Sequence, residues 1–322
     1  MNYRRLGRSG LKVSAIALGT AQCDWWVDEA TSRRLFDTYV ELGGNLIDTA
    51  DVYPVFGDGV GGRASEEFVG RWLKSTAKRH EVLLATKVSG RMGPGPNDQG
   101  LSWRHIVKAV EGSLSRLQVD CIDLYQAHDD YDDVPIEETI RAFDNLVQRG
   151  LVRYVGCSNF KAWRLMKSLG ISERCAQVGY VSVQERYNLV ERGRIESELQ
   201  PLCVEEGIGL LPYNPLAKGF LCGRYHPQGV LPNSPRAAGV QSVYFNDRNW
   251  QILEVLRRIA QDCDSTCTQV ALAWLLSRPA VVAPVVGAST VGQLQEIMAA
   301  PQLNLPPEDL VQLNTISEVP VA

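Results

Sequence analysis

Short apolar runs alternate with longer amphipathic segments along nearly the whole chain. The runs are mostly rich in Val, Ile and Leu and are flanked by turn residues, which is typical of strands buried on both faces of a parallel sheet. We predict such strands at residues 15–19, 46–48, 82–86, 122–126, 152–157, 178–183, 209–213 and 281–285. Amphipathic helical patterns lie between strands, at residues 64–78, 103–117, 136–149, 200–206 and 250–262.

Residues at the expected helix ends agree with these bounds. Ser102 is a suitable N-cap for the helix that begins at residue 103, because its hydroxyl can accept a hydrogen bond from a first-turn N–H. Pro201 suits the start of its helix, since proline lacks the N–H that the first turn leaves unbonded. Gly150 follows the helix before it, where glycine commonly ends helices.

Strands that alternate with helices predict an α/β protein with a parallel sheet and helices outside it. An open doubly wound sheet and a closed (β/α)8 TIM barrel both have this order, and eight regularly spaced units favour the barrel. The length of 322 residues would suggest two domains at roughly 150 residues each. Because no linker rich in Pro, Gly or Ser divides the chain, we instead expect a single domain over residues 1–322.

Three segments outside the strand–helix units have predicted places. Residues 2–13 resemble an N-terminal β-hairpin that caps one end of the barrel. Residues 88–100 and 218–246 are long and rich in Gly and Pro, and each leaves the C-terminal end of a strand. Because barrel enzymes build their active sites from such loops, we expect the site on the C-terminal face.

Composition narrows the functional classes. Hydrophobic residues make up 45% of the chain and charged residues 22%, which excludes a disordered, collagenous or coiled-coil protein. The 33 basic and 37 acidic residues give a net charge of −4, which argues against a nucleic-acid partner. No apolar stretch is long enough for a membrane span or a signal peptide, so we expect a cytoplasmic protein without a membrane partner.

The eight cysteines are scattered along the chain. The nearest pair, Cys263 and Cys267, is separated by three residues and has no histidine nearby, which matches neither a zinc site nor a CxxC redox motif. We therefore expect reduced thiols and no metal site.

Polar residues end three consecutive predicted strands. Asp48, Lys87 and His128 stand at the C-terminal ends of strands two, three and four, and Tyr53 follows Asp48 closely enough to fold back over the same end. A lysine buried at a strand end needs a carboxylate partner, and Asp48 is available. We expect Lys87 to lower the pKa of Tyr53, so that Tyr53 can protonate a carbonyl oxygen while His128 orients that oxygen.

A GxGxxG sequence at residues 57–62 is a weak match to the dinucleotide-binding fingerprint. The fingerprint places its first glycine directly after a strand and at the start of a helix, whereas Gly57 lies nine positions beyond Asp48. We interpret residues 54–62 as a loop at the mouth of the barrel, which would shape access to the site.

Several motifs together resemble the aldo-keto reductases, and the resemblance covers about residues 3–310. It is closest to a bacterial branch that shares features with potassium-channel β subunits. The motifs are RLGRSGLKVS at residues 5–14, LGT at 18–20, NLIDTADVY at 45–53, ATK at 85–87, DLYQAH at 123–128, GCSN at 156–159 and YNPLAKGFL at 213–221.

This resemblance implies a (β/α)8 barrel that reduces aldehydes or ketones with NADPH. Asp48, Tyr53, Lys87 and His128 match the family's catalytic tetrad, with Tyr53 as the proton donor. Ser158, Asn159 and Gln184 match positions that hold the nicotinamide carboxamide, and Tyr213 matches the ring that stacks on it. The other expected cofactor contacts are Gly19, Thr20, Asp48, Asn214, Pro215, Leu216, Lys218, Gly219, Arg224, Gly287, Ser289, Gln293 and Glu296.

The chain departs from the family pattern at the adenosine end. Gln293 stands where many members have a basic residue for the 2′-phosphate, and Ile297 stands where an asparagine often contacts adenine. Lys218 and Arg224 could supply the charge instead. We therefore expect NADP as cofactor, with NAD as the alternative.

Substrate contacts are less evident from the sequence. Trp25 and Trp26 follow the first strand and, with Tyr53 and His128, could form an aromatic wall for a sugar ring or an aromatic carbonyl compound. The sequence leaves open the substrate, the favoured reaction direction, the oligomeric state and whether residues 218–246 close over the cofactor.

Three function classes remain. The first is an NADP-dependent carbonyl reductase or alcohol dehydrogenase that acts on a small molecule. The second is a hydrolase or transferase in which Cys157 and His128 form a nucleophilic pair. The third is a cofactor-binding sensor or partner subunit with little turnover, as the channel β-subunit resemblance permits.

Overall fold

A closed barrel of parallel strands forms the centre of the molecule. The structure is a computed structural model that describes residues 1–23, 26–54, 62–232, 234 and 236–318. The barrel order is β10-β3-β4-β5-β6-β7-β8-β9, which confirms the predicted (β/α)8 architecture. Its strands are β3 (Ala17–Gly19), β4 (Leu46–Asp48), β5 (Leu83–Val88), β6 (Ile122–Ala127), β7 (Val152–Ser158), β8 (Ser182–Arg186), β9 (Gly209–Tyr213) and β10 (Val285–Val286).

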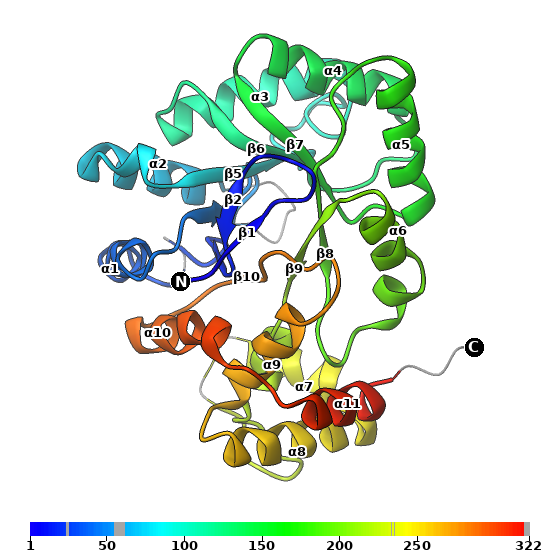
Figure 1. Cartoon of the computed structure of the whole chain (residues 1–322). Helices are drawn as coiled ribbons and strands as arrows, with labels where there is room; N and C mark the ends of the chain where they lie inside the picture. Colours follow the sequence, from blue (N-terminus) through cyan, green and yellow to red (C-terminus); the bar gives the residue numbers. More distant parts are fainter. Residues whose placement is uncertain (24–25, 55–61, 233, 235, 319–322) are drawn as a thin grey trace.

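Helices surround the strands, as Figure 1 shows. The longer helices are α1 (Glu29–Glu41), α2 (Ala64–Thr76), α3 (Trp103–Leu117), α4 (Ile136–Gln148), α5 (Ala162–Arg174), α6 (Gln200–Glu205), α7 (Ala237–Tyr244), α8 (Asp247–Asp262), α9 (Cys267–Leu276), α10 (Val291–Ala299) and α11 (Pro307–Ile316). Short helical turns are η1 (Lys78–His80), η2 (Ile195–Leu199), η3 (Ala217–Cys222) and η4 (Ala300–Gln302). In the described part of the chain, no helix combines the length and the apolar character needed to span a membrane.

The three residues expected at helix ends lie where predicted, although α8 begins at residue 247 rather than 250 and α2 ends at residue 76 rather than 78. The Ser102 side chain accepts a hydrogen bond from the His105 N–H at 3.3 Å, and so caps α3. Gly150, just beyond α4, has a φ of +72°, a left-handed conformation that glycine adopts without steric cost. Pro201 lies in the first turn of α6.

The N-terminal hairpin covers the N-terminal end of the barrel, as predicted. Strands β1 (Tyr3–Arg5) and β2 (Lys12–Ser14) pair antiparallel, and the hairpin lies in front of the strands in Figure 1. Leu6 and Val13 pack with residues at strand starts, including Leu46 and Leu124. Gly7 permits this contact, because a Cβ there would lie 2.2 Å from the Val181 carbonyl oxygen.

Six of the eight barrel strands differ from their predicted bounds, and the differences are largest for β8 and β10, which each begin four residues later than expected. β8 begins at residue 182 rather than 178, because the apolar residues before it serve packing: Tyr180 is buried against Phe143 and Phe160. β10 spans Val285–Val286 rather than residues 281–285, although Val281 forms an isolated bridge with Leu210. Pro284 has no N–H to donate, so it interrupts the ladder.

The two long loops follow β5 and β9, as predicted. The first contains no helix or strand before α3. The second contains more regular structure than expected, since η3 begins it and α7 lies within it. Both leave the C-terminal ends of their strands.

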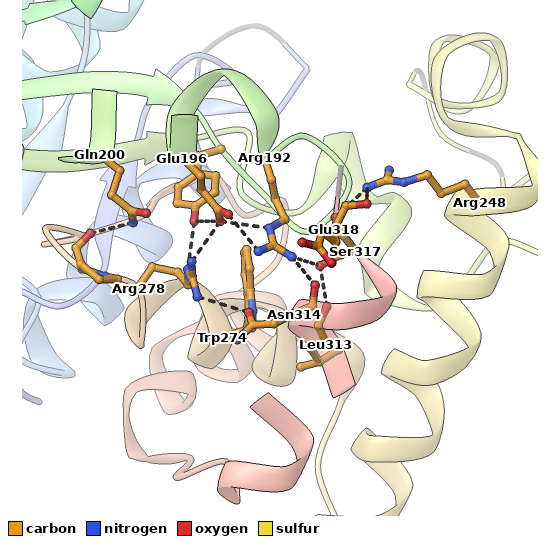
Figure 2. Close-up of polar contacts among 12 residues, drawn as sticks. Arg192, Glu196, Gln200, Arg248, Trp274, Arg278, Leu313, Asn314, Ser317 and Glu318 are labelled. Atoms are coloured by element: carbon orange, nitrogen blue, oxygen red, sulfur yellow. Dashed lines mark hydrogen bonds and ion pairs between the residues drawn. The ribbon is translucent and has the colours of Figure 1, made fainter. Parts of the chain in front are cut away.

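The last helix is held by arginine side chains from the segment after β8 and from α8, shown in Figure 2. Arg192 donates to the Asn314 carbonyl oxygen at 2.7 Å and to Ser317 Oγ at 2.6 Å. Arg248 donates to the Ser317 carbonyl oxygen at 2.7 Å. These cations bond acceptors at the C-terminal end of α11, where free carbonyl oxygens and the helix dipole favour positive charge.

Candidate active site

The structure brings the four predicted catalytic residues together at the C-terminal end of the barrel. Asp48 ends β4, Lys87 lies in β5, and His128 directly follows β6. Lys87 Nζ lies 2.5 Å from Asp48 Oδ2 and 3.4 Å from Tyr53 Oη. Tyr53 Oη lies 3.5 Å from His128 Nε2. Parallel register places these strand ends beside one another although they are far apart in sequence.

Lys87 is completely buried and is compensated by Asp48. Its ammonium group also donates to the Thr49 carbonyl oxygen at 2.9 Å. Burial acts to lower the pKa of Lys87, but Asp48 and Tyr53 outweigh it, so the pKa lies above its ordinary value. Lys87 therefore carries a fixed positive charge beside the Tyr53 hydroxyl.

The pKa of Tyr53 corrects one expectation from the sequence. Burial raises this pKa above 10, and Lys87 offsets only part of the effect. Lys87 lowers this pKa, as expected, but does not bring it below its ordinary value, because the desolvation of a phenolate costs more than one nearby cation returns. Tyr53 is consequently protonated at neutral pH, the form that can donate a proton.

His128 is neutral in this environment. Burial and the charge of Lys87 lower its pKa to about 3. Its ring meets the Tyr53 ring edge-on, with 5.6 Å between ring centroids. A neutral imidazole that carries its proton on Nε2 can donate a hydrogen bond to an oxygen near Tyr53.

Two buried glutamine amides hold the other oxygen of Asp48. Gln126 Nε2 donates to Asp48 Oδ1 at 3.1 Å, and Gln184 Nε2 donates to the same atom at 2.9 Å. Gln184 was expected to contact the cofactor, and its bond to Asp48 was not foreseen. Gln126 is not among the predicted site residues. Side chains alternate along a strand and Gln126 precedes His128 by two positions, so the sequence does place both residues on one face.

The start of α2 fixes the segment that carries Tyr53. The Ser65 N–H donates to the Tyr53 carbonyl oxygen at 3.2 Å, and Ser65 Oγ donates to the Thr20 carbonyl oxygen at 3.0 Å. Ser65 is fully buried. One residue thus ties the loop after β4 to the loop after β3, which positions the tyrosine relative to the rest of the site.

A cavity of about 1270 Å³ opens beside these residues. Tyr53, His128 and Trp26 line it, while Trp25 and residues 57–61 of the glycine-rich loop lie outside the described residues. Every residue that the sequence suggested for cofactor binding also lines this cavity: Gly19, Thr20, Asp48, Ser158, Asn159, Gln184, Tyr213, Asn214, Pro215, Leu216, Lys218, Gly219, Arg224, Gly287, Ser289, Gln293 and Glu296.

Just after the C-terminal end of β7, Asn159 links the expected carboxamide contacts to the expected stacking ring. Its Nδ2 donates to Ser158 Oγ at 3.2 Å and to the His128 carbonyl oxygen at 2.9 Å. Its Oδ1 accepts a hydrogen bond from the Tyr213 hydroxyl at 2.9 Å. Amide and hydroxyl groups beside a flat ring are the groups needed to hold a nicotinamide in one orientation.

Towards the rim, the cavity suits phosphate groups. Lys218 and Arg224 line it, and neither has a carboxylate partner among the residues described. The N-terminus of α10 also faces this region, with Thr290 as its cap and the Ser289 N–H bonded to Gln293 Oε1 at 2.9 Å. Unpaired cations and a helix N-terminus together favour anionic ligands.

Some cavity residues were not predicted. They are Ala21, Gln22, Arg186, Cys222, Tyr225, Ser234, Arg236, Gly239, Thr266, Thr268, Val285 and Val286. The cavity residues in the loop after β9 belong to a segment that was expected at the site. Which of its side chains reach the cavity depends on tertiary contacts, which the sequence pattern does not give. Thr266 and Thr268 flank the start of α9, which no strand-end pattern marks.

Cys157 is not arranged as a nucleophile. It is fully buried, its Sγ contacts the Ser182 carbonyl oxygen at 3.9 Å, and burial holds its pKa well above the ordinary value. A reactive cysteine needs access and a stabilised thiolate, and this residue has neither. The structure therefore contradicts the alternative of a Cys157–His128 pair.

Comparisons with known proteins extend over nearly the whole chain. The profile of the Aldo/keto reductase family matches residues 15–318. An uncharacterized oxidoreductase of Bacillus subtilis (strain 168) is 36% identical over 321 residues, 98% of this chain and 96% of the relative. A probable voltage-gated potassium channel subunit beta of Arabidopsis thaliana is 35% identical over 314 residues, 93% and 91% of the two chains. A versiconal hemiacetal acetate reductase of Aspergillus parasiticus is 33% identical over 341 aligned positions, 97% and 96% of the two chains.

Proposed function

The chain belongs to the aldo/keto reductase family, and from that premise we propose that it interconverts an aldehyde or ketone and the corresponding alcohol with NADP(H). Tyr53 is the general acid in reduction and the general base in the reverse direction. Lys87, held in place by Asp48, supports its ionisation, and His128 orients the carbonyl oxygen.

The arrangement around Lys87 is the observation that carries this proposal. A fully buried lysine bonds a carboxylate on one side and lies 3.4 Å from a tyrosine hydroxyl on the other. Purely structural compensation of Lys87 would require only Asp48. Lys87 also lies close to the Tyr53 hydroxyl, beside a large cavity, and this is the arrangement that a tyrosine proton donor requires.

In reduction, a nicotinamide held by Ser158, Asn159, Gln184 and Tyr213 would supply the hydride for the carbonyl carbon. The carbonyl oxygen then gains negative charge and takes the proton from Tyr53 Oη. Lys87 stabilises the tyrosinate that remains, since its ammonium group lies within reach of that oxygen. His128 donates a hydrogen bond to the substrate oxygen, and its lowered pKa keeps it from competing as an acid.

NADP is the cofactor that the cavity residues suit best. Ser158, Asn159 and Gln184 would hold the carboxamide, and Tyr213 would stack on the ring. Lys218 and Arg224 supply positive charge for the phosphates, and neither forms an ion pair with a carboxylate in the described chain. Glu296 is a cavity carboxylate that would instead disfavour added phosphate charge, so NAD is the alternative.

Trp26 lines the same cavity as Tyr53 and His128, which supports its proposed contact with substrate. Trp26 is 37% exposed although the Arg236 guanidinium lies over its ring, so part of its apolar surface remains accessible. A sugar ring or an aromatic carbonyl compound would suit such a surface.

Nucleotide binding and turnover test this function directly. Titration with NADPH and NADH should quench tryptophan fluorescence, and NADPH should bind more tightly. An aldehyde and ketone panel should then yield NADPH oxidation that depends on the carbonyl compound. Failure to bind either nucleotide would refute the proposal.

A second candidate is a cofactor-binding partner subunit with little turnover. Its support is the similarity to proteins named probable voltage-gated potassium channel subunit beta, from Arabidopsis thaliana and from Oryza sativa. Tight NADPH binding without turnover of any carbonyl compound would favour it over the reductase.

A further inference from the structure

The Asp48 carboxylate is bonded at both of its oxygens. Oδ2 faces Lys87 at 2.5 Å, whereas Oδ1 accepts from both Gln126 and Gln184. A carboxylate can only accept hydrogen bonds, so both glutamine side chains must turn their NH₂ groups towards it. Two neutral amides therefore stabilise the charge of Asp48 from the side opposite the lysine.

Gln126 differs from Gln184 in its surroundings. Gln184 lines the cavity, where its Oε1 is available to a ligand, whereas Gln126 is fully buried and does not line the cavity. Gln126 Oε1 has no partner within the described chain, so its donation to Asp48 is the polar contact that orients this amide.

The barrel interior makes room for the Gln126 side chain at Gly156. A Cβ at this position would lie 3.3 Å from Gln126 Cγ and 2.6 Å from Ser182 Oγ. Any larger residue would crowd both side chains. Gly156 in β7 thus leaves room for Gln126 on one side of β6, while the Gln126 amide reaches Asp48 of β4 on the other side, beyond β5.

We propose that Gln126 is a positioning residue of the reaction, which holds the Asp48 carboxylate turned towards Lys87, while Gln184 also lines the cavity proposed for the cofactor. The proposal rests on the proposed reductase function. Gln126 acts through Asp48 and Lys87 on the Tyr53 hydroxyl, and it touches neither substrate nor cofactor.

Loss of this amide has a defined consequence. The Oδ1 atom of Asp48 would lose a donor in a buried setting, which favours transfer of the Lys87 proton to the carboxylate. A neutral lysine stabilises the Tyr53 phenolate less than an ammonium group does. Tyr53 would then ionise at higher pH and donate its proton less readily.

Gln126→Met tests this role, because methionine has a similar length and cannot donate. With NADPH and benzaldehyde, or the best substrate from the panel, we expect kcat to fall about tenfold. The Kd for NADPH and the KM for the carbonyl compound should stay within about twofold. The ultraviolet titration of Tyr53, taken as the difference between each protein and its Tyr53→Phe derivative, should shift to higher pH.

Gln200→Met is the matched control. Gln200 is also buried and donates from Nε2, at 2.9 Å, to the Pro279 carbonyl oxygen, but it lies in the network of Figure 2 outside the cavity. Gln200→Met should have a lower free energy of unfolding but an unchanged kcat and an unchanged Tyr53 titration. If Gln126→Met likewise changed stability alone, Gln126 would be structural and the proposal would be wrong.

Gln126→Glu covers the case in which the methionine variant does not fold. A protonated glutamic acid can still donate to Asp48, whereas an ionised one repels it. Activity should approach that of the unmodified protein at low pH and fall as pH rises, more steeply than for Gln200→Glu. Equal pH profiles for the two variants would overturn the proposal.

Failure of the proposed function gives a different result. A protein with no carbonyl turnover would still show whether Gln126 controls the Tyr53 titration, because that titration requires no substrate. An unchanged titration with normal turnover would refute only the role of Gln126.

Discussion

Burial controls the charge of the titratable side chains around the barrel. It raises the pKa of Tyr53, lowers that of His128, and is opposed at Lys87 by a carboxylate. The same effect acts at Glu185, which lies beside Gln184 in β8 with only 1% of its surface exposed. Burial raises the pKa of Glu185 to about 7. Arg194 opposes this effect only in part, because its side chain is mostly exposed and its guanidinium nitrogen lies 3.5 Å from Glu185 Oε1.

Glu185→Gln should therefore change the pH dependence of stability. The folded pKa lies above the unfolded value, so the folded state binds more protons between about pH 4.5 and 7, and the glutamate's contribution to stability falls as pH rises through that range. Above pH 7 the variant should be more stable by roughly 3 kcal/mol. Urea unfolding at several pH values measures the difference.

Glu198→Gln is the control, since Glu198 is exposed on η2. Its stability should follow that of the unmodified protein at each pH. If the free energies of unfolding of Glu185→Gln and the unmodified protein differed by the same amount at all pH values, Glu185 would not have a raised pKa in the folded protein.

At the level of single residues, the sequence predicted which side chains meet in the site but not how burial and neighbouring charges together shift their pKa values. Asp48, Lys87 and His128 could be found because each ends a parallel strand. The direction of the Tyr53 pKa could not, because it depends on desolvation by residues far apart in the chain. Gln126 could have been found from the alternation of side chains along its strand.

At the scale of elements, the segment between η3 and α8 is fixed at both ends. Arg257 donates to the Gly223 carbonyl oxygen at 3.0 Å near one end. At the other end, the Tyr244 hydroxyl donates to Glu191 Oε2 at 3.0 Å. Between them, the Arg236 guanidinium lies over the Trp26 ring, 4.7 Å from its centroid. This contact joins the loop after β9 to the loop after β3, on opposite sides of β10.

We expect this contact to retain the cofactor. Arg236→Gln should speed NADPH dissociation about fivefold, since a partly exposed cation–π contact contributes about 1 kcal/mol. Stopped-flow displacement of NADPH measures the rate. The exposed Arg104, in α3, provides the control variant Arg104→Gln, which should have no effect. Equal rates for both variants would show that the loop does not hold the cofactor.

Element boundaries show why pattern alone was insufficient for some strands. The apolar residues before β8 are buried by aromatic packing rather than by a strand ladder. Pro284 interrupts the run that was predicted as the last strand. α7, within residues 218–246, has no strong apolar stripe, and its position depends on contacts such as that of Tyr244 with Glu191.

At the scale of the whole molecule, the closed barrel brings these elements to one end. Length alone suggested two domains, whereas the family profile spans residues 15–318 without division, and we propose that the chain forms one unit. The net charge of −4 does not describe the cavity, where Lys218, Arg224 and Arg236 have no carboxylate partner in the described chain. The anionic cofactor would meet a local field opposite in sign to the net charge.

Tyr53→Phe is the variant that best tests whether Tyr53 donates the proton in carbonyl reduction. Steady-state rates with NADPH and the best carbonyl substrate, measured beside the NADPH Kd, separate chemistry from binding. We predict that kcat falls about a thousandfold while NADPH binding is retained, and that Cys157→Ala remains active. Full activity in Tyr53→Phe would show that Tyr53 is not the proton donor. Loss of activity in Cys157→Ala alone would show that the reaction depends on the cysteine instead.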